Sequence, residues 1–180
     1  MTAKECITGR RSIRAFTDQP VSHELLAQIV EVASFAPSWK NTQITRYIAV
    51  EGAKKSELAK CTKIFPGNGT IMEKAPMVIA VTMIKGRSGY ERDGSFSTSK
   101  GNHWQSFDAG LSVQNFCLAA HENGLGTVIL GLFDESKVLE ILDLPEGESI
   151  SALIPIGYPA EQPEMPKRKA ASDLLRIYGA

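Results

Sequence analysis

The stretch "HWQSFDAGLSVQNFCLAAHENGLG", His103 to Gly126, decides the fold. Its apolar residues recur at helical spacing and cover most of the helix surface; they are Trp104, Phe107, Leu111, Val113, Phe116, Cys117, Leu118, Ala119 and Ala120. Asn123 and Gly124 predict a left-handed cap that ends this helix. A helix that is apolar on most sides has to be covered on most sides. In a chain of 180 residues, we expect a second subunit to provide part of that cover.

Strand patterns lie on both sides of this helix. "MVIAVTMI", Met77 to Ile84, is a continuous apolar run that is typical of a central strand covered on both faces. "GTVILGLF", Gly126 to Phe133, predicts a strand that breaks at Gly131, and "SALIPIGYP", Ser151 to Pro159, predicts another buried strand. Arg46 to Val50 predicts a short strand.

Three further helices are predicted between these strands. Ser22 caps a helix that Pro37 stops, and its apolar residues share one face: Leu25, Leu26, Ile29, Val30 and Ala33. Residues 53–60 predict a short helix. Asp134 caps a helix that carries Val138, Leu139, Ile141 and Leu142. Helices and strands therefore alternate along one domain that spans residues 1–180.

Composition excludes several classes of protein. Lys plus Arg and Asp plus Glu number 20 each, so no overall field favours nucleic acid or an anionic membrane. No apolar run approaches the roughly 20 residues of a membrane-spanning helix. The N-terminus "MTAKECITGRR" lacks the apolar core of a signal peptide. We expect a cytoplasmic protein with no membrane and no nucleic-acid partner.

The cysteines and histidines do not indicate a metal site. Cys6, Cys61 and Cys117 have neither disulfide nor metal-ligand spacing, and we interpret them as reduced thiols. The three histidines are isolated, with no His-x-x-x-His or Cys-x-x-Cys partner. No metal is expected.

Two segments are predicted to lie outside the core. "KGRSGYERDGSFSTSKGN", residues 85–102, is rich in Gly and Ser, and we expect it to be a mobile flap over a site. Residues 160–180 carry prolines and the basic triplet Lys167-Arg168-Lys169 before "DLLRIYGA". They read as an arm that can wrap a neighbouring subunit.

The segment "GRRSIRAF", Gly9 to Phe16, places three arginines within five positions of a chain with no net charge. Guanidinium groups match phosphate oxygens two at a time, and a serine hydroxyl between them adds a short donor. Arg10, Arg11, Ser12 and Arg14 therefore form a candidate phosphate site. The alternative is a solvated charged turn, because such short motifs recur by chance.

The segment "APSWKNTQ", Ala36 to Gln43, concentrates polar side chains directly after a helix. Asn and Gln amides can donate and accept at once, which suits the edge of a heterocycle that presents carbonyls and ring nitrogens. The alternative is an amide-rich connecting loop that satisfies its own backbone.

The segment "GLGTVILG" is not a dinucleotide fingerprint, because its glycines precede a strand instead of linking it to a helix. Gly131 can let backbone N–H groups approach a flat ligand closely; the alternative is a turn glycine at the end of a strand. No G-x-S-x-G nucleophile elbow is present. Phosphate donors and ring-binding amides without a nucleophile indicate that a cofactor brings the chemistry.

Taken in this order, the motifs resemble the nitroreductase family of FMN-dependent oxidoreductases over nearly the whole chain. "RRSIRAF" comes first, then a helix into "APSWKNTQ", a buried strand, "FDAGLSVQNFCLAAHENGLGT" and a basic "KRK" near the end. The resemblance implies an α+β fold, a mixed sandwich with a mainly antiparallel central sheet flanked by helices. It also implies a homodimer with one FMN in each of two sites at the subunit interface.

The resemblance also implies roles for individual residues. Arg10, Arg11, Ser12 and Arg14 would hold the flavin phosphate and ribityl chain, and Lys167 or Arg168 would close on the same phosphate. The other cofactor-binding residues would lie near the ring or ribityl chain, those of the second motif partly at the partner's site; they are Pro37, Ser38, Trp39, Asn41, Gln43, Asn68, Val128, Ile129, Leu130 and Gly131. The backbone N–H groups of Leu130 and Gly131 would lie near flavin N5, and no side chain is assigned as catalytic.

Two positions depart from the family's pattern. Ile44 and Thr45 stand where members often have Pro-Trp, and Leu130 stands where many have an acidic side chain. These changes affect the polarity at the ring edge and the choice of substrate.

The resemblance implies transfer of a hydride from NADH or NADPH through flavin N5 to an electron-poor acceptor such as a nitroaromatic, a quinone or an enone. A non-catalytic flavin carrier or redox sensor would use the same binding residues. An RNA- or phosphoprotein-binding module is a further alternative, but zero net charge and few interleaved aromatics disfavour a nucleic-acid face.

Overall fold

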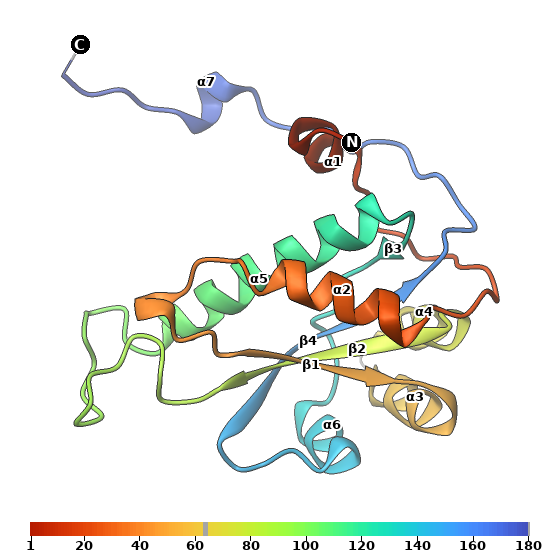
Figure 1. Cartoon of the computed structure of the whole chain (residues 1–180), viewed down its shortest axis with the longest axis horizontal. Coiled ribbons are helices and arrows are strands. Elements are labelled where there is room, and N and C mark those ends of the chain that lie inside the picture. Colours follow the sequence, from red (N-terminus) through yellow and green to blue (C-terminus); the bar gives the residue numbers. More distant parts are fainter. Residues whose placement is uncertain (63–64, 180) are drawn as a thin grey trace.

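The computed structural model describes residues 1–62 and 65–179 and shows helices packed on both faces of one sheet (Figure 1). The helices are α1 (Ala3–Gly9), α2 (His23–Ala33), α3 (Gly52–Ala59), α4 (Pro66–Lys74), α5 (His103–Glu122), α6 (Glu135–Leu142) and α7 (Ala171–Leu174), with short 3₁₀ turns at Trp39–Asn41 and Lys60–Thr62. The strands are β1 (Thr45–Val50), β2 (Met77–Ile84), β3 (Gly126–Thr127) and β4 (Glu148–Gly157).

The sheet has the strand order β1-β2-β4-β3, and every neighbouring pair is antiparallel. The predicted central strand is confirmed: β2 lies between β1 and β4, and its first six residues are buried. A register irregularity falls between Val81 and Thr82 on β2. Strands β2 and β3 follow each other in the chain but are not adjacent in the sheet, because β4 lies between them.

Helix α5 is confirmed over His103–Glu122, and Gly124 takes the left-handed conformation with φ of 77°. It lies with α2 on one face of the sheet (Figure 1), where Ile29 and Phe116 meet Ile79 and Ile154. Each of these four side chains is fully buried. Burying such a side chain stabilises the fold by about 1.5–3 kcal/mol.

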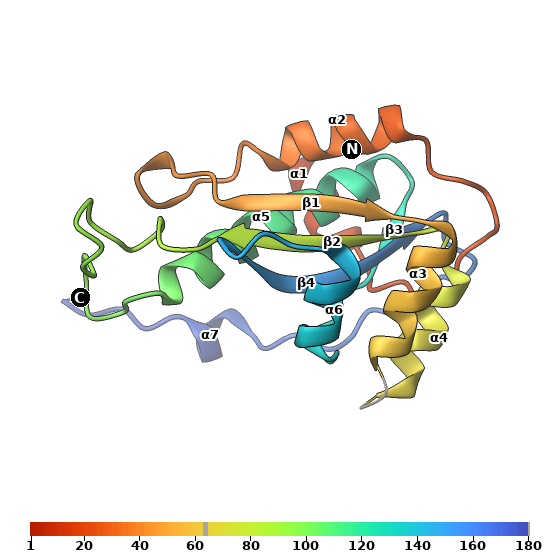
Figure 2. The ribbon, with the colours of Figure 1, turned by 90° about the horizontal axis from the view of Figure 1, so that it is seen from below.

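The opposite face of the sheet is covered by α3, α4 and α6 (Figures 1 and 2). Leu58, Met72 and Val138 from these helices pack against Ala80 and Leu153 of the sheet. The predicted caps hold two of the molecule's helices: Ser22 Oγ accepts from Leu25 N at 3.1 Å, and Asp134 Oδ1 accepts from Lys137 N at 3.3 Å.

Some elements differ from the sequence-based expectation. The predicted strand 126–133 is a regular strand only over β3, although Leu130 and Leu153 still exchange two backbone hydrogen bonds. Helices α1 and α4 were not anticipated. Helix α1 begins with a capping box in which Thr2 and Glu5 bond each other's backbone N–H, a signature that the sequence carries as Thr-x-x-Glu.

The segment 85–102 folds as a compact loop with its own hydrogen bonds, including Glu91 N to Ser95 O at 2.8 Å and Ser97 N to Gly89 O at 2.9 Å. Its mobility stays a prediction. The described part of the C-terminal arm, residues 160–179, is almost entirely exposed and leads from the end of β4 to α7 (Figure 1). In residues 1–62 and 65–179, no helix combines the length and apolarity that a bilayer crossing requires.

Candidate functional site: an arginine segment, a bare strand edge and an amide loop

The arginine segment Arg10–Arg14 lies against the start of β3. Ser12 forms a parallel bridge with Thr127, and Ile13 N donates to Thr127 O at 3.0 Å. Gly126 permits this approach, because a Cβ there would meet the Ile13 side chain at 2.6–2.9 Å. The fold therefore brings the arginines beside the residues that follow Gly126.

The guanidinium groups of this segment have carbonyl oxygens as their hydrogen-bond partners. Arg11 Nη1 donates to the carbonyls of Thr8, Gly9 and Arg10, and Arg14 Nη1 donates to Ser12 O at 3.3 Å. Among the described residues, no ion pair joins Arg10, Arg11 or Arg14 to a carboxylate. Their charge remains available to an anion.

His121, at the end of α5, has a pKa that responds to the positive charge of this segment. Its pKa is lowered, first by partial burial and then by the nearby Arg10 and Arg11. An ideal Cβ at Gly9 would lie 3.0 Å from His121 Nε2, so the α1 end of the segment touches this ring.

Glu161 ties the base of the C-terminal arm to the arginine segment, a contact that sequence reasoning missed. Its Oε1 accepts from the backbone N–H of Arg14 and of Ala15, the latter at 3.1 Å. The carboxylate thus holds the main chain of the segment and forms no ion pair with the Arg14 guanidinium among the described residues. No local pattern signals a pairing of residues 146 or more positions apart.

Along the segment Val128–Gly131, every second backbone N–H group donates to the sheet. Val128 and Leu130 are buried, and their N–H groups donate to Pro155 and Leu153. The Leu130 N–H, which we expect near flavin N5, is used by the sheet at 2.9 Å, and its position relative to a flavin stays a prediction. The N–H groups of Ile129 and Gly131 make no backbone hydrogen bond within the described chain, and both residues are exposed. The donors left without a backbone partner at this edge are the N–H groups of Ile129 and Gly131.

Asn68 joins the same edge from α4. It is buried, and its Nδ2 donates to Leu132 O at 3.4 Å. The arginine segment, Asn68 and Val128–Gly131 therefore form one contiguous group.

The amide loop, Ala36–Gln43, is folded on itself and strained. Gln43 N donates to Ser38 Oγ, and Gln43 Nε2 donates to Asn41 Oδ1, each at 3.0 Å. Lys40, Asn41 and Gln43 have φ between 45° and 56°, a left-handed conformation that costs a non-glycine residue roughly 1–3 kcal/mol. Pro37, Asn41 and Gln43 are exposed. Strain of this kind clusters at ligand-binding sites.

Asp108, which sequence reasoning missed, anchors this loop. It is buried on α5, and its Oδ2 accepts from Trp39 N at 2.9 Å and from Ser88 Oγ at 2.6 Å. The available signal was an acidic residue within a helix that is apolar on most sides.

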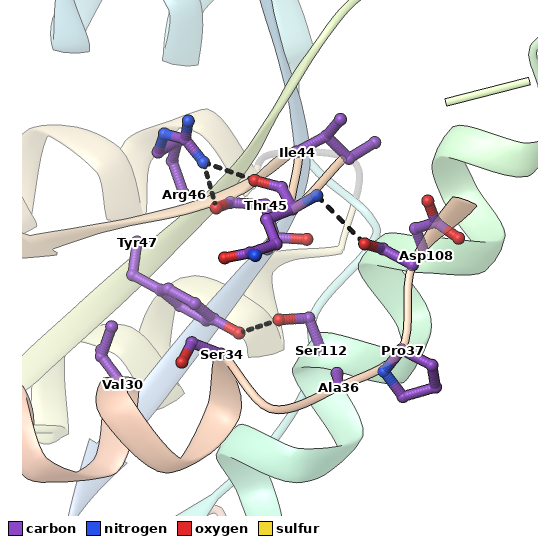
Figure 3. Close-up of a pocket in the computed structure, with 12 residues that line it drawn as sticks. Val30, Ser34, Ala36, Pro37, Ile44, Thr45, Arg46, Tyr47, Asp108 and Ser112 are labelled. Atoms are coloured by element: carbon purple, nitrogen blue, oxygen red, sulfur yellow. Dashed lines mark hydrogen bonds between the residues drawn. The ribbon is translucent and has the colours of Figure 1, made fainter. Parts of the chain in front are cut away.

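A cavity of about 310 Å³ lies behind the amide loop, between α2, β1 and α5 (Figure 3). Tyr47 and Ser112 close its floor with a hydrogen bond of 2.7 Å between their hydroxyls. Burial raises the pKa of Tyr47 to about 12. The hydroxyl therefore stays protonated and positions α5 against β1.

The two groups lie at opposite ends of α5. Asp108, which holds the amide loop, and His121, which touches the arginine segment, are thirteen residues apart on this helix, about 20 Å along its axis. Figure 1 shows the loop after α2 at one end of α5 and the segment after α1 at the other. One chain therefore offers two half-sites instead of one closed pocket.

Lys167 and Arg168 lie on the exposed arm. The hydrogen bonds of the Arg168 guanidinium go to the carbonyls of Pro166 and Lys167. No contact among the described residues joins these two side chains to Arg10 or Arg14, so their approach to a shared phosphate stays a prediction. In the same part of the chain, no three His, Cys, Asp or Glu side chains gather closely enough to hold a metal.

Comparison with known proteins places this geometry in a family. The family model described as "Nitroreductase family" matches residues 7–66 and 63–158, which include the arginine segment, the amide loop, Asn68 and Val128–Gly131. The chain belongs to the nitroreductase family. The family resemblance and the nitroreductase-like α+β fold predicted from the motifs are confirmed. The matched region ends before the arm that carries Lys167 and Arg168.

Individual nitroreductase relatives cover most of the chain. A protein of Methanothermobacter thermautotrophicus, named as an NADH dehydrogenase/NAD(P)H nitroreductase, is 32% identical over 167 residues, which are 91% of this chain and 80% of that protein. A nitroreductase of Desulfovibrio desulfuricans, solved in complex with FMN, is 30% identical with a TM-score of 0.77 over 98% of this chain and 96% of that one.

A nitroreductase family protein of Streptococcus pneumoniae shares the fold at a TM-score of 0.87 and 24% identity. The match covers 98% of this chain and 100% of that one. The two chains therefore share the fold over nearly their full lengths.

Proposed function

We propose that this chain is an FMN-dependent oxidoreductase that uses NADH or NADPH as reductant. Support comes from the family, from the FMN bound by the relative of D. desulfuricans and from the name of the relative of M. thermautotrophicus. The observation that carries the proposal is that arginines without an ion pair in the described residues lie beside a strand edge whose outward N–H groups have no backbone partner there.

The residues present fit FMN part by part. Arg10, Arg11 and Arg14 offer guanidinium donors for a phosphate, and Ser12 lies between them. The exposed edge at Ile129 and Gly131 offers an apolar surface and two main-chain donors to a flat ring. Asn68 adds an amide at the same edge. Lys167 or Arg168 would add a second cation if the arm closes.

The amide loop completes the site from a second subunit. Asp108 and His121, which contact the amide loop and the end of α1, are about 20 Å apart along α5. We therefore assign Ser38, Trp39, Asn41 and Gln43 to the partner's site. Apolar side chains exposed on α1, α2, the turn after α2 and α5 offer a surface for the partner: Ile7 (56%), Val32 (50%), Phe35 (82%) and Phe107 (57%). We propose a homodimer with two such composite sites.

When bound, the flavin supplies the hydride chemistry between a nicotinamide and an electron-poor acceptor such as a nitroaromatic, a quinone or an enone. The chain's own residues bind and orient. The arginine segment fixes the anionic end, Gly131 N–H addresses the ring edge, and the exposed Ile129 side chain shields that edge from water. No nucleophilic side chain is required.

The proposal is tested by removing the phosphate donors. Arg10→Ala/Arg14→Ala loses the yellow cofactor, because two charge-assisted contacts, each about 1.5–3 kcal/mol, disappear. The control Lys60→Ala/Lys74→Ala removes the same charge from exposed positions on α4 and the turn before it. Flavin content is measured by absorbance after incubation with excess FMN, and the oligomeric state by gel filtration.

Flavin retained in the arginine variant would show that the phosphate is held elsewhere. A wild-type protein that binds FMN but is reduced by neither NADH nor NADPH would instead be a flavin carrier or redox sensor.

A further inference from the structure

The loop 85–102 and the amide loop enclose a hollow of about 730 Å³, here called the flap hollow. Its walls are Trp39, Lys40 and Thr42 from the amide loop and Gly86, Arg87 and Tyr90–Asp93 from the loop 85–102. Trp39 and Lys40 lie within the loop that we place at the flavin. The flap hollow therefore adjoins the proposed flavin site.

Three cations, Lys40, Arg87 and Arg92, and two acids, Glu91 and Asp93, line the flap hollow. Glu91 pairs with Lys40 at 3.0 Å, and Asp93 accepts from the Ser95 hydroxyl at 2.6 Å and from the Ser95 N–H at 3.0 Å. Lys40 balances the charge of Glu91, whereas the Ser95 contacts stabilise the Asp93 carboxylate without cancelling its charge. Arg87 and Arg92 are exposed and form no ion pair within residues 1–62 and 65–179.

The flap hollow is built before any ligand arrives. Asp108 holds Trp39 and Ser88 with one carboxylate oxygen, and Gly86 N donates to Gln105 Oε1 at 2.8 Å. Gly89 has a φ of 82°, and a Cβ there would meet Gly101 O at 2.5 Å. These contacts hold Trp39, Gly86 and Ser88 on α5, and Arg87 lies between the last two.

Two polar atoms in its walls point to a missing partner. Trp39 Nε1 and Thr42 Oγ1 are buried, and neither has a hydrogen-bond partner in the described part of the chain. A buried polar group left unpaired costs about 1–3 kcal/mol. Such groups call for a partner that the described chain does not supply, such as a water, an ion or a ligand.

We propose that the flap hollow binds the 2′-phosphate of NADPH through Arg87 and Arg92, and that the enzyme therefore prefers NADPH to NADH. This inference rests on the proposed function. Guanidinium groups bind a phosphate with two parallel hydrogen bonds, and NADH has only a hydroxyl at this position. The pyrophosphate is common to both coenzymes, so a contact with that group would not discriminate between them.

The first test measures reduction of the flavin-loaded enzyme by each coenzyme in a stopped-flow instrument. Arg87→Ala/Arg92→Ala raises the dissociation constant for NADPH about tenfold or more and leaves that for NADH and the limiting rate unchanged. The matched control Lys60→Ala/Lys74→Ala changes neither. An equal loss for both coenzymes overturns the proposal, as does a wild-type enzyme that binds NADH and NADPH alike.

The second test needs no turnover. Adenosine 2′,5′-bisphosphate is titrated into the flavin-loaded protein by calorimetry, with adenosine 5′-monophosphate as the comparison. We expect binding of the bisphosphate alone, abolished in the arginine variant. Absent or equal binding of the two nucleotides overturns the inference. If neither coenzyme reduces the flavin, the proposed function fails, while this titration still decides the phosphate subsite.

Discussion

Single side chains at the arginine segment set the chemistry of the half-site through their charge. Arg10 and Arg11 lie close enough to His121 to lower its pKa, and both lack a carboxylate partner among the described residues. Glu161 is near but bonds backbone N–H groups. Because Glu161 is held by main-chain N–H groups, the guanidinium groups of the segment can bind an anionic ligand.

His121 reports this charge. In flavin-free protein, Arg10→Ala raises the pKa of His121 toward its ordinary value, because one of two nearby cations is removed while burial remains. NMR titration of the histidine ring protons measures the shift, His121→Asn assigns the resonance, and Arg46→Ala is the control. An unchanged pKa would place Arg10 away from His121.

The same lowered pKa has a consequence for stability. Because the unfolded chain binds the proton more tightly than the folded one, this contribution is complete above the ordinary histidine pKa of about 6.5 and is lost as the pH falls below it. His121→Asn therefore weakens the pH dependence of unfolding in that window. A wild-type pH profile in the Asn variant would contradict this.

At the scale of elements, α5 connects the amide loop and the loop 85–102. A single buried carboxylate on this helix, Asp108, accepts from Trp39 N and Ser88 Oγ. The helix thereby positions both walls of the flap hollow. Since the amide loop holds three left-handed residues that are not glycine, this anchor also offsets part of its strain.

Asp108→Ala lowers the free energy of unfolding by about 2–3 kcal/mol, because two buried donors lose a charged acceptor. Ser88→Ala, which removes one of the donors, costs about 1 kcal/mol. Urea denaturation measures both, and hydrogen exchange at the Trp39 amide reports the loop directly. Unchanged protection of Trp39 in Asp108→Ala would show that other contacts hold the loop.

At the scale of the whole molecule, the proposed site is shared between subunits because each chain separates its two halves along α5. The arginine segment and Val128–Gly131 meet at one end, and the amide loop lies at the other. The exposed C-terminal arm, with Leu174 and Tyr178 70% and 86% exposed, is available to a neighbour as well.

Complementation between subunits tests this arrangement. One variant carries Arg10→Ala/Arg14→Ala, the other Asn41→Ala/Gln43→Ala, and each homodimer alone binds little flavin. A mixed dimer contains one site with an intact arginine segment and an intact amide loop, so it recovers one flavin per dimer. Absorbance of the purified mixed dimer measures this recovery. No recovery would mean that a single chain forms each site.

Most of the elements could be read from local patterns. The apolar periodicity predicts α5 and β2, and Ser22 and Asp134 predict where α2 and α6 begin, because spacing and caps act over a few residues. Helix α1 carried its own capping-box signal. The order of the motifs indicated the family, which the matches confirm.

Contacts between residues distant in the chain could not be read in this way. The strand order β1-β2-β4-β3, the engaged N–H of Leu130, the clamp at Asp108 and the position of Arg87 and Arg92 beside Trp39 all follow from packing. Hydrophobic burial is non-directional, so a pattern of apolar residues states which faces are covered and not what covers them. Only the folded chain brings partners such as Arg14 and Glu161 together.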